Sequence, residues 1–172
     1  MSEKFNGLSL SARLSYGVLC AENYVVNVYP NRNWKPLFQK LWMFSTDMFW
    51  DEWEERIMEV TPEYLFEFQT YEESDFEYLT KEEYNFFVKL FKDTDAEINT
   101  ILLHIIEMEQ AYAYTSFYDN GLYTLPLLSD IESILASKNI PLPNIEKVSF
   151  SKITEADGFG TQFDAKKLSQ II

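Results

Sequence analysis

The side chains that could do chemistry in this sequence are mostly carboxylates, and they are concentrated between Asp51 and Leu79. This stretch, DEWEERIMEVTPEYLFEFQTYEESDFEYL, contains eleven acidic residues and one base, Arg56, so its net charge is −10. The rest of the chain has 17 acids and 13 bases and carries only −4 of the total −14. Seven aromatic residues lie among these acids. Tyrosine and tryptophan beside carboxylates favour a partner rich in lysine and arginine.

We therefore expect part of this segment to bind a basic protein partner, with the acids steering it and the aromatic residues docking the segment on the core. The alternative interpretation is an ordinary solvated helical face. The residues expected to contact the partner are Asp51, Glu54, Glu55, Glu59, Glu63, Glu67, Tyr71, Glu72, Glu73, Asp75 and Glu77.

Catalysis by these carboxylates would need a pair in unlike environments, so that one carboxyl group stays protonated while the other is ionised. Adjacent acids on a helix, such as Glu54 with Glu55, point in different directions, and most should be solvated. The sequence contains no G-x-S-x-G, no P-loop and no G-x-G-x-x-G. We expect no catalytic residue, no cofactor and no metal.

His104 and Cys20 are the single histidine and the single cysteine. A di-iron carboxylate site requires Glu-x-x-His from two helices, whereas here His104 precedes Glu107 and a second histidine is missing. A helical enzyme or metal-binding protein using His104 with Glu107 or Glu109 is kept as the alternative function. Cys20 has no basic neighbour in sequence that would lower its pKa, so we expect a buried, inert thiol.

The overall composition indicates a folded, soluble protein. The 172 residues are 47% hydrophobic and 17% aromatic, which argues against a disordered acidic tail. The charge disfavours direct binding to nucleic acid or to anionic membranes. The N-terminal residues MSEKFNGLSLSARL lack the pattern of a signal peptide, and no apolar run could span a bilayer. We expect a cytoplasmic protein with no membrane association.

Apolar residues recur at helical spacing along most of the chain. The pattern predicts a helix from Leu10 to Val28, a second from about Trp34 to Phe44, and a third from a Thr46 cap through Ile57. Thr61-Pro62 is typical of a helix start. Two capping boxes, Thr80–Glu83 and Thr94–Glu97, predict two further helix starts.

The helix after the second capping box is apolar on more than one side, which is typical of the central helix of a domain. Ile101, Leu102, Ile105 and Met108 are its expected core residues. DNG at 119–121 predicts a turn, and another helix should follow, ending at Lys138-Asn139. We predict a single all-α domain over residues 1–172, a bundle of about eight helices including a short C-terminal one, with little or no sheet.

The stretch from Ile140 to Gly160 contains IPLPNIEKVSF and, after it, the turn DGFG. In size, charge, absence of a catalytic motif and this closing proline turn, the chain resembles the acidic, all-helical immunity proteins of bacterial polymorphic toxin and contact-inhibition systems. In some of those families we expect Gly-Trp-Gly where this chain has Gly158-Phe159-Gly160. The resemblance implies a non-catalytic protein that neutralises a toxin domain, commonly a basic nuclease, by occluding its active site.

Overall fold

The computed structural model describes residues 3–46, 50–113, 117 and 121–172, and the fold in these ranges is all-α, as predicted. The one pairing of extended backbone within them is an isolated bridge between Leu8 and Lys152. The seven α-helices of the described ranges are α1 (Leu10–Val28), α2 (Lys35–Leu41), α3 (Trp50–Met58), α4 (Pro62–Leu65), α5 (Lys81–Phe91), α6 (Ala96–Gln110) and α7 (Thr124–Ser137). No described helix is long and apolar enough to cross a membrane.

Short 3₁₀ turns account for the difference from the predicted eight helices. They are η1 (Glu3–Phe5), η2 (Trp42–Ser45), η3 (Tyr71–Glu73), η4 (Ile145–Val148), η5 (Ala156–Gly158) and η6 (Ala165–Lys167). The predicted second helix tightens into η2 at Trp42, and the predicted C-terminal helix is only the single turn η6. The C-terminal segment leaves the helical path because the Ser169 hydroxyl accepts the backbone N–H groups of Ile171 and Ile172.

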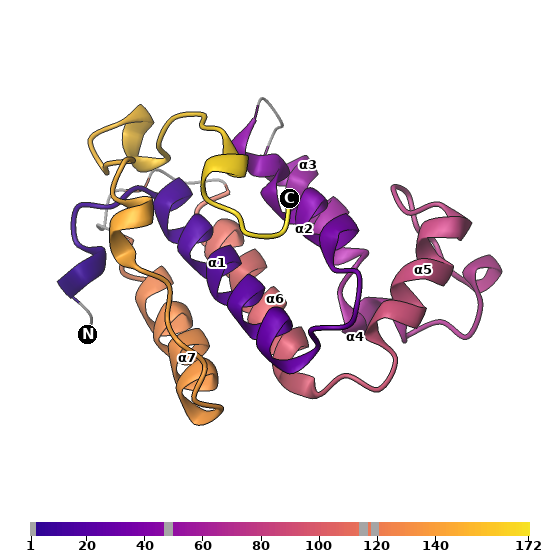
Figure 1. Ribbon diagram of the computed structural model, residues 1–172. Helices are drawn as coiled ribbons and strands as arrows, with labels where there is room; N and C mark the ends of the chain where they lie inside the picture. The colour runs from indigo at the N-terminus through magenta and orange to yellow at the C-terminus, as the bar shows by residue number, and fades with distance from the viewer. Residues whose placement is uncertain (1–2, 47–49, 114–116, 118–120) are drawn as a thin grey trace.

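Helices α1, α6 and α7 pack side by side and form the body of the molecule, while α2 and α3 lie on the side of α1 and α6 away from α7 (Figure 1). Gly17 allows the close approach of α1 to α6. A Cβ atom at this position would lie 3.0 Å from both Ile105 Cγ1 and Met108 Cε. Helices α4 and α5 stand together to one side of this body, and the irregular part of residues 51–79 connects them (Figure 1).

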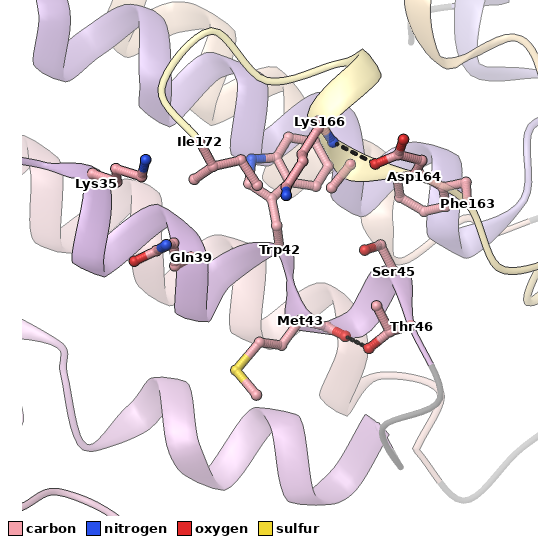
Figure 2. Close-up of a pocket in the computed structure, with 11 residues that line it drawn as sticks. Lys35, Gln39, Trp42, Met43, Ser45, Thr46, Phe163, Asp164, Lys166 and Ile172 are labelled. Atoms are coloured by element: carbon pink, nitrogen blue, oxygen red, sulfur yellow. Dashed lines mark hydrogen bonds between the residues drawn. The ribbon is translucent and has the colours of Figure 1, made fainter.

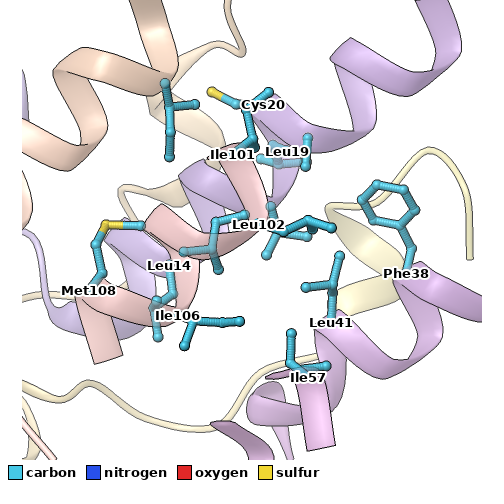
Figure 3. Packing of buried hydrophobic residues seen from close by; sticks show 14 of the residues in the cluster. Leu14, Leu19, Cys20, Phe38, Leu41, Ile57, Ile101, Leu102, Ile106 and Met108 are labelled. Carbon is cyan, nitrogen blue, oxygen red and sulfur yellow. The ribbon is translucent and has the colours of Figure 1, made fainter. Parts of the chain in front are cut away.

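The core is one continuous cluster of buried apolar side chains. Ile101, Leu102, Ile105 and Met108 are all fully buried, so the predicted central role of α6 is confirmed. Figure 3 shows side chains of α6 meeting those of α1, with Leu41 of α2 and Ile57 of α3 on the far side.

Cys20 lies inside this cluster and is fully buried (Figure 3). Burial raises the pKa of its thiol well above the ordinary value, with a smaller contribution from the Glu132 carboxylate. We expect the native protein to react with a thiol reagent at least about a hundredfold more slowly than the urea-unfolded chain, because the thiolate is the nucleophile. Labelling followed by absorbance checks this, and equally fast native labelling would show that the buried face of α1 is misassigned.

The predicted helix starts were partly right. The capping box at Thr80 is present with both of its hydrogen bonds, and Thr61 caps α4 with Pro62 at the first helical position. The predicted box at Thr94 is wrong. Asp95 is the N-cap of α6 but makes no side-chain capping bond. Tertiary contacts replace the local cap, because the Asp95 carboxylate accepts from the Tyr24 hydroxyl at 2.6 Å and from Lys138 Nζ at 3.0 Å.

Two other predicted features include residues that the structure does not describe. Residues 47–49 are among these, so the Thr46 cap is untested, although α3 itself follows at Trp50. Asp119 and Asn120 of the predicted turn are also among them, and Gly121 has a φ of +70°.

The segment after α7 closes the fold across the start of α1. The DGFG turn is present, with positive φ at Gly158 and Gly160. Gly160 must be a glycine, because a Cβ atom would lie 2.4 Å from Ser151 Oγ. The C-terminal residues are then held by Glu22 of α1. Its fully buried carboxylate accepts from Trp42 Nε1 at 2.8 Å and from the backbone N–H of Gln170 at 2.9 Å.

Candidate functional site

The acidic segment, Asp51 to Leu79, runs through α3, α4 and η3 and returns to the start of α5. Its first helix is anchored in the core by Trp53 and Ile57, both fully buried. Beyond α4 the chain has little regular structure, so its position depends on side-chain contacts.

An aromatic cluster holds this irregular part against α5. Tyr64, Phe68, Tyr71 and Phe76 surround one another and Tyr84 of α5, with ring centroids 5.6–6.0 Å apart. Edge-to-face and offset ring pairs at these distances are stabilising. Tyr71, which the sequence analysis placed in the binding face, is half-buried and stacks on Phe76 at 6.0 Å. The structure therefore gives Tyr71 a packing role instead.

Glu59 also needs correction as a predicted binding residue. Its side chain is buried, and its carboxylate accepts three backbone N–H groups, from Glu77 at 2.6 Å, Tyr78 at 2.9 Å and Leu79 at 2.8 Å. These three donors belong to a stretch without helix or strand partners, so Glu59 supplies the acceptors that the backbone lacks. Glu59 fixes the returning chain and is not available to a partner.

Most of the other predicted binding residues do reach solvent. The exposed ones are Asp51, Glu55, Glu63, Glu67, Glu72, Glu73, Asp75 and Glu77, while Glu54 is partly buried and accepts from Gln110 Nε2 at 2.6 Å. Among the described residues, two ion pairs involve carboxylates of the segment, Glu52 with Arg56 and Glu72 with Lys81. Most of the negative charge is thus uncompensated at the surface.

Several of these acids line one concave surface, which we call the acidic hollow. It has a volume of about 250 Å³ and is lined by Glu54, Glu55, Met58, Glu59, Tyr64, Asp75, Glu77 and Tyr78. Five of these eight residues are acidic, and none is basic. The Tyr64 hydroxyl donates to Asp75 at 3.1 Å and the Tyr78 hydroxyl donates to Glu55 at 2.7 Å. These bonds hold two carboxylates in place around the hollow.

Tyr78 of the acidic hollow contacts both a carboxylate and a cation of the chain itself. The hydrogen bond to Glu55 raises the pKa of Tyr78 to about 12, so its hydroxyl remains a neutral donor. The guanidinium of Arg56 lies 4.5 Å from the centroid of the Tyr78 ring, a distance typical of a cation–π contact. Carboxylates, an aromatic ring and a guanidinium thus lie together at this edge of the hollow.

Phe66 is the residue that sequence analysis missed as a surface feature. It is 52% exposed, and no ring contact involves it within the described part of the chain, in contrast to the clustered aromatic residues around it. The signal was present in the sequence, because Phe66 and Phe68 are two positions apart and cannot share one helical face.

His104 and its carboxylate neighbours form no metal site in the described residues. Its side chain is partly buried, with Nδ1 3.1 Å from Glu107 Oε2 and Nε2 3.8 Å from Asp130 Oδ2. Glu109, the other acid considered with it, is buried, and its interacting acids are Glu54 and Asp51 of the α3 region.

Glu109 has one fully buried carboxylate oxygen without a hydrogen-bond partner. Burial, followed by the neighbouring Glu54 and Asp51 carboxylates, raises its pKa from 4.5 to about 7. Between pH 4.5 and pH 7 the folded protein therefore binds more protons than the unfolded chain. The contribution of protonated Glu109 to the free energy of unfolding is full below pH 4.5 and is lost as the pH rises through 7.

Glu109→Gln should therefore be more stable than the wild type above pH 7, by about 1–3 kcal/mol, and less sensitive to pH between 5 and 8. Urea unfolding at pH 5 and pH 8 measures this, with the exposed Glu107→Gln as the matched control. If the free energy of unfolding of wild type and of Glu109→Gln depends on pH in the same way, the pKa of Glu109 is not raised in the folded protein.

A different hollow, between α2 and the C-terminal segment, is less acidic (Figure 2). It has a volume of about 310 Å³, and Trp42, Met43 and Phe163 give it apolar walls. Lys35 and Lys166 are the basic residues that line it, and Asp164 is an acceptor. Asp164 accepts the backbone N–H of Lys166 at 3.1 Å and so caps the start of η6. These residues do not form a nucleophile–base pair.

Comparison with protein-family models, curated proteins and solved structures finds no match to this chain.

Proposed function

We propose that this chain is a non-catalytic binding protein that captures a basic protein partner on its acidic segment. The observation that carries the proposal is the acidic hollow, in which the carboxylates of Glu54, Glu55, Asp75 and Glu77 meet without a lining base, and two tyrosine hydroxyls hold Asp75 and Glu55 in place. Fixed carboxylates around a concave surface concentrate negative potential and attract a basic partner.

The partner class that fits this chemistry best is a toxin domain with a cationic, phosphate-binding active site. The chain would then act in the bacterial cytoplasm as an immunity protein, and it would occlude the toxin's groove without chemistry. The rigid support of the segment by Glu59 and the aromatic cluster favours this function, because a preorganised surface loses less entropy on binding.

A metal-dependent or general acid–base enzyme using His104 remains the second candidate. The contact that favours it is the His104–Glu107 pair, at 3.1 Å. Metal analysis of the purified protein distinguishes the two functions, because one metal ion per chain would favour the enzyme.

The test of the binding proposal starts from a partner captured with the wild-type protein and produced separately. Association rates are then measured for a variant with Glu67→Lys, Asp75→Lys and Glu77→Lys, three acids whose side chains are exposed. The rate should fall about tenfold or more at low salt and much less at high salt.

The matched control reverses three exposed acids outside the segment, Glu3, Asp130 and Glu146. Glu132 would be a poor choice, because its side chain is only 18% exposed and it pairs with Lys4. Equal slowing in both triple variants, or association indifferent to salt, would contradict the proposal.

A further inference from the structure

On the other side of α4 from the acidic hollow lies a second depression, which we call the Phe66 groove. It has a volume of about 460 Å³ and is bordered by α4, the connection between α5 and α6, and the first turn of α6. The apolar side chains that line it are Pro62, Phe66, Phe91 and Ala96. Pro62 and Phe91 are buried, whereas Phe66 is 52% exposed, so the groove has an apolar wall open to solvent.

The groove is held in shape by hydrogen bonds. The backbone N–H of Glu63 donates to Asn99 Oδ1 of α6 at 3.0 Å, which ties the first turn of α4 to α6. The backbone N–H of Phe66 donates to the carbonyl of Pro62 at 3.0 Å and fixes the other end of the turn. A preformed site of this kind is typical of a binding surface, because little order has to be gained on association.

The rim of the groove is acidic. Glu63 and Asp93 are exposed there, and Asp95 contributes a third carboxylate that is paired with Lys138. Lys92 is the one basic residue lining the groove. Asp93 has a φ of +59°, a conformation that costs free energy in residues other than glycine, so the rim turn is held in place by its surroundings.

The two depressions share α4 as a common wall. Tyr64 lines the acidic hollow, whereas Glu63 and Phe66 line the Phe66 groove. Neighbouring residues of a helix point about 100° apart, so a single turn presents both surfaces to anything that crosses it. A partner segment lying across α4 meets carboxylates on one side and an apolar wall on the other.

We infer that the Phe66 groove takes one large apolar side chain from a basic segment of the partner protein, while that segment's lysine or arginine side chains enter the acidic hollow. The inference rests on the proposed function and adds the recognition element to it. The carboxylates set the rate of encounter, and the apolar side chain against Phe66 slows dissociation. We assign the groove to a basic segment because its rim carries three acids and one base.

The test uses two amidated helical peptides of equal positive charge, one with a leucine among its lysines and arginines and one with a serine in its place. Wild-type protein should bind the leucine peptide about tenfold more tightly, the range expected for burying one aliphatic side chain. Phe66→Ala should remove this preference and leave the affinity for the serine peptide unchanged. The control, Leu142→Ala, removes an apolar side chain that is 42% exposed outside the groove and should change neither affinity.

The outcomes separate this inference from the proposed function. If the reversal of Glu67, Asp75 and Glu77 weakens both peptides while Phe66→Ala leaves the leucine preference intact, the inference is wrong and the acidic binding face stands. If the charge reversals weaken neither peptide, the proposed function fails. If the wild-type protein forms a dimer in sedimentation that Phe66→Ala dissociates, the occupant is a second copy of the chain and the inference is overturned. Circular dichroism of Phe66→Ala checks that the fold is retained.

Discussion

Replacing Glu59 with alanine is expected to lower the free energy of unfolding by about 3–5 kcal/mol. Its buried carboxylate is the acceptor for three consecutive backbone N–H groups, those of Glu77, Tyr78 and Leu79. Hydrogen bonds to a charged group contribute about 1.5–3 kcal/mol each, and solvent can replace only part of them at this buried position. Urea unfolding measured by circular dichroism gives the difference.

The comparison variant for Glu59→Ala is Glu63→Ala, an exposed acid of the same segment, which should change stability by about 0.5 kcal/mol or less. Glu59→Ala should also raise hydrogen exchange at residues 77–79 before it affects α6. Stability equal to the wild type would mean that the segment returning to α5 is held by the aromatic cluster alone, and the structural role given to Glu59 would be withdrawn.

The second large effect is expected in the core. Leu102→Ala should cost about 2–5 kcal/mol, because Leu102 is fully buried at the centre of α6 and its neighbours cannot close the cavity. Chemical unfolding at a fixed pH measures the change. Leu122, which is 54% exposed, provides a leucine-to-alanine control with an expected cost of about 0.5 kcal/mol or less. A loss well below 1 kcal/mol at Leu102 would contradict the central position of α6.

The helices could be predicted where local rules and tertiary packing agree. Thr80 with Glu83 makes its capping box as predicted, and the apolar spacing of α6 corresponds to the buried face of that helix. The prediction failed at Thr94, because the Thr94 hydroxyl donates to the Phe91 carbonyl at 2.8 Å and the N-cap of α6 is Asp95 instead. The Asp95 side chain is engaged by Tyr24 and Lys138 from distant parts of the sequence. No local pattern contains those two partners.

The candidate site was predictable as a segment but not residue by residue. Charge concentration identified Asp51–Leu79, and eight of its acids are exposed. The same composition could not distinguish Glu59, which is bonded to the chain's own backbone, from the solvated Glu55 four residues earlier. It also could not show that Tyr71 packs in the aromatic cluster while Phe66 stays exposed, since both depend on how α4 meets α5 and α6.

The central claim, that the carboxylates around α4 are the binding face, is tested most directly by chemical-shift mapping. Isotope-labelled protein is titrated with the basic leucine peptide, and the shifted backbone signals are assigned. We expect the largest changes at Glu55, at Glu63 to Glu67 and at Asp75 to Tyr78, and we expect them to fade as salt is raised. Changes spread evenly over the surface, or centred on α7 or on the hollow beside Trp42, would contradict the central claim.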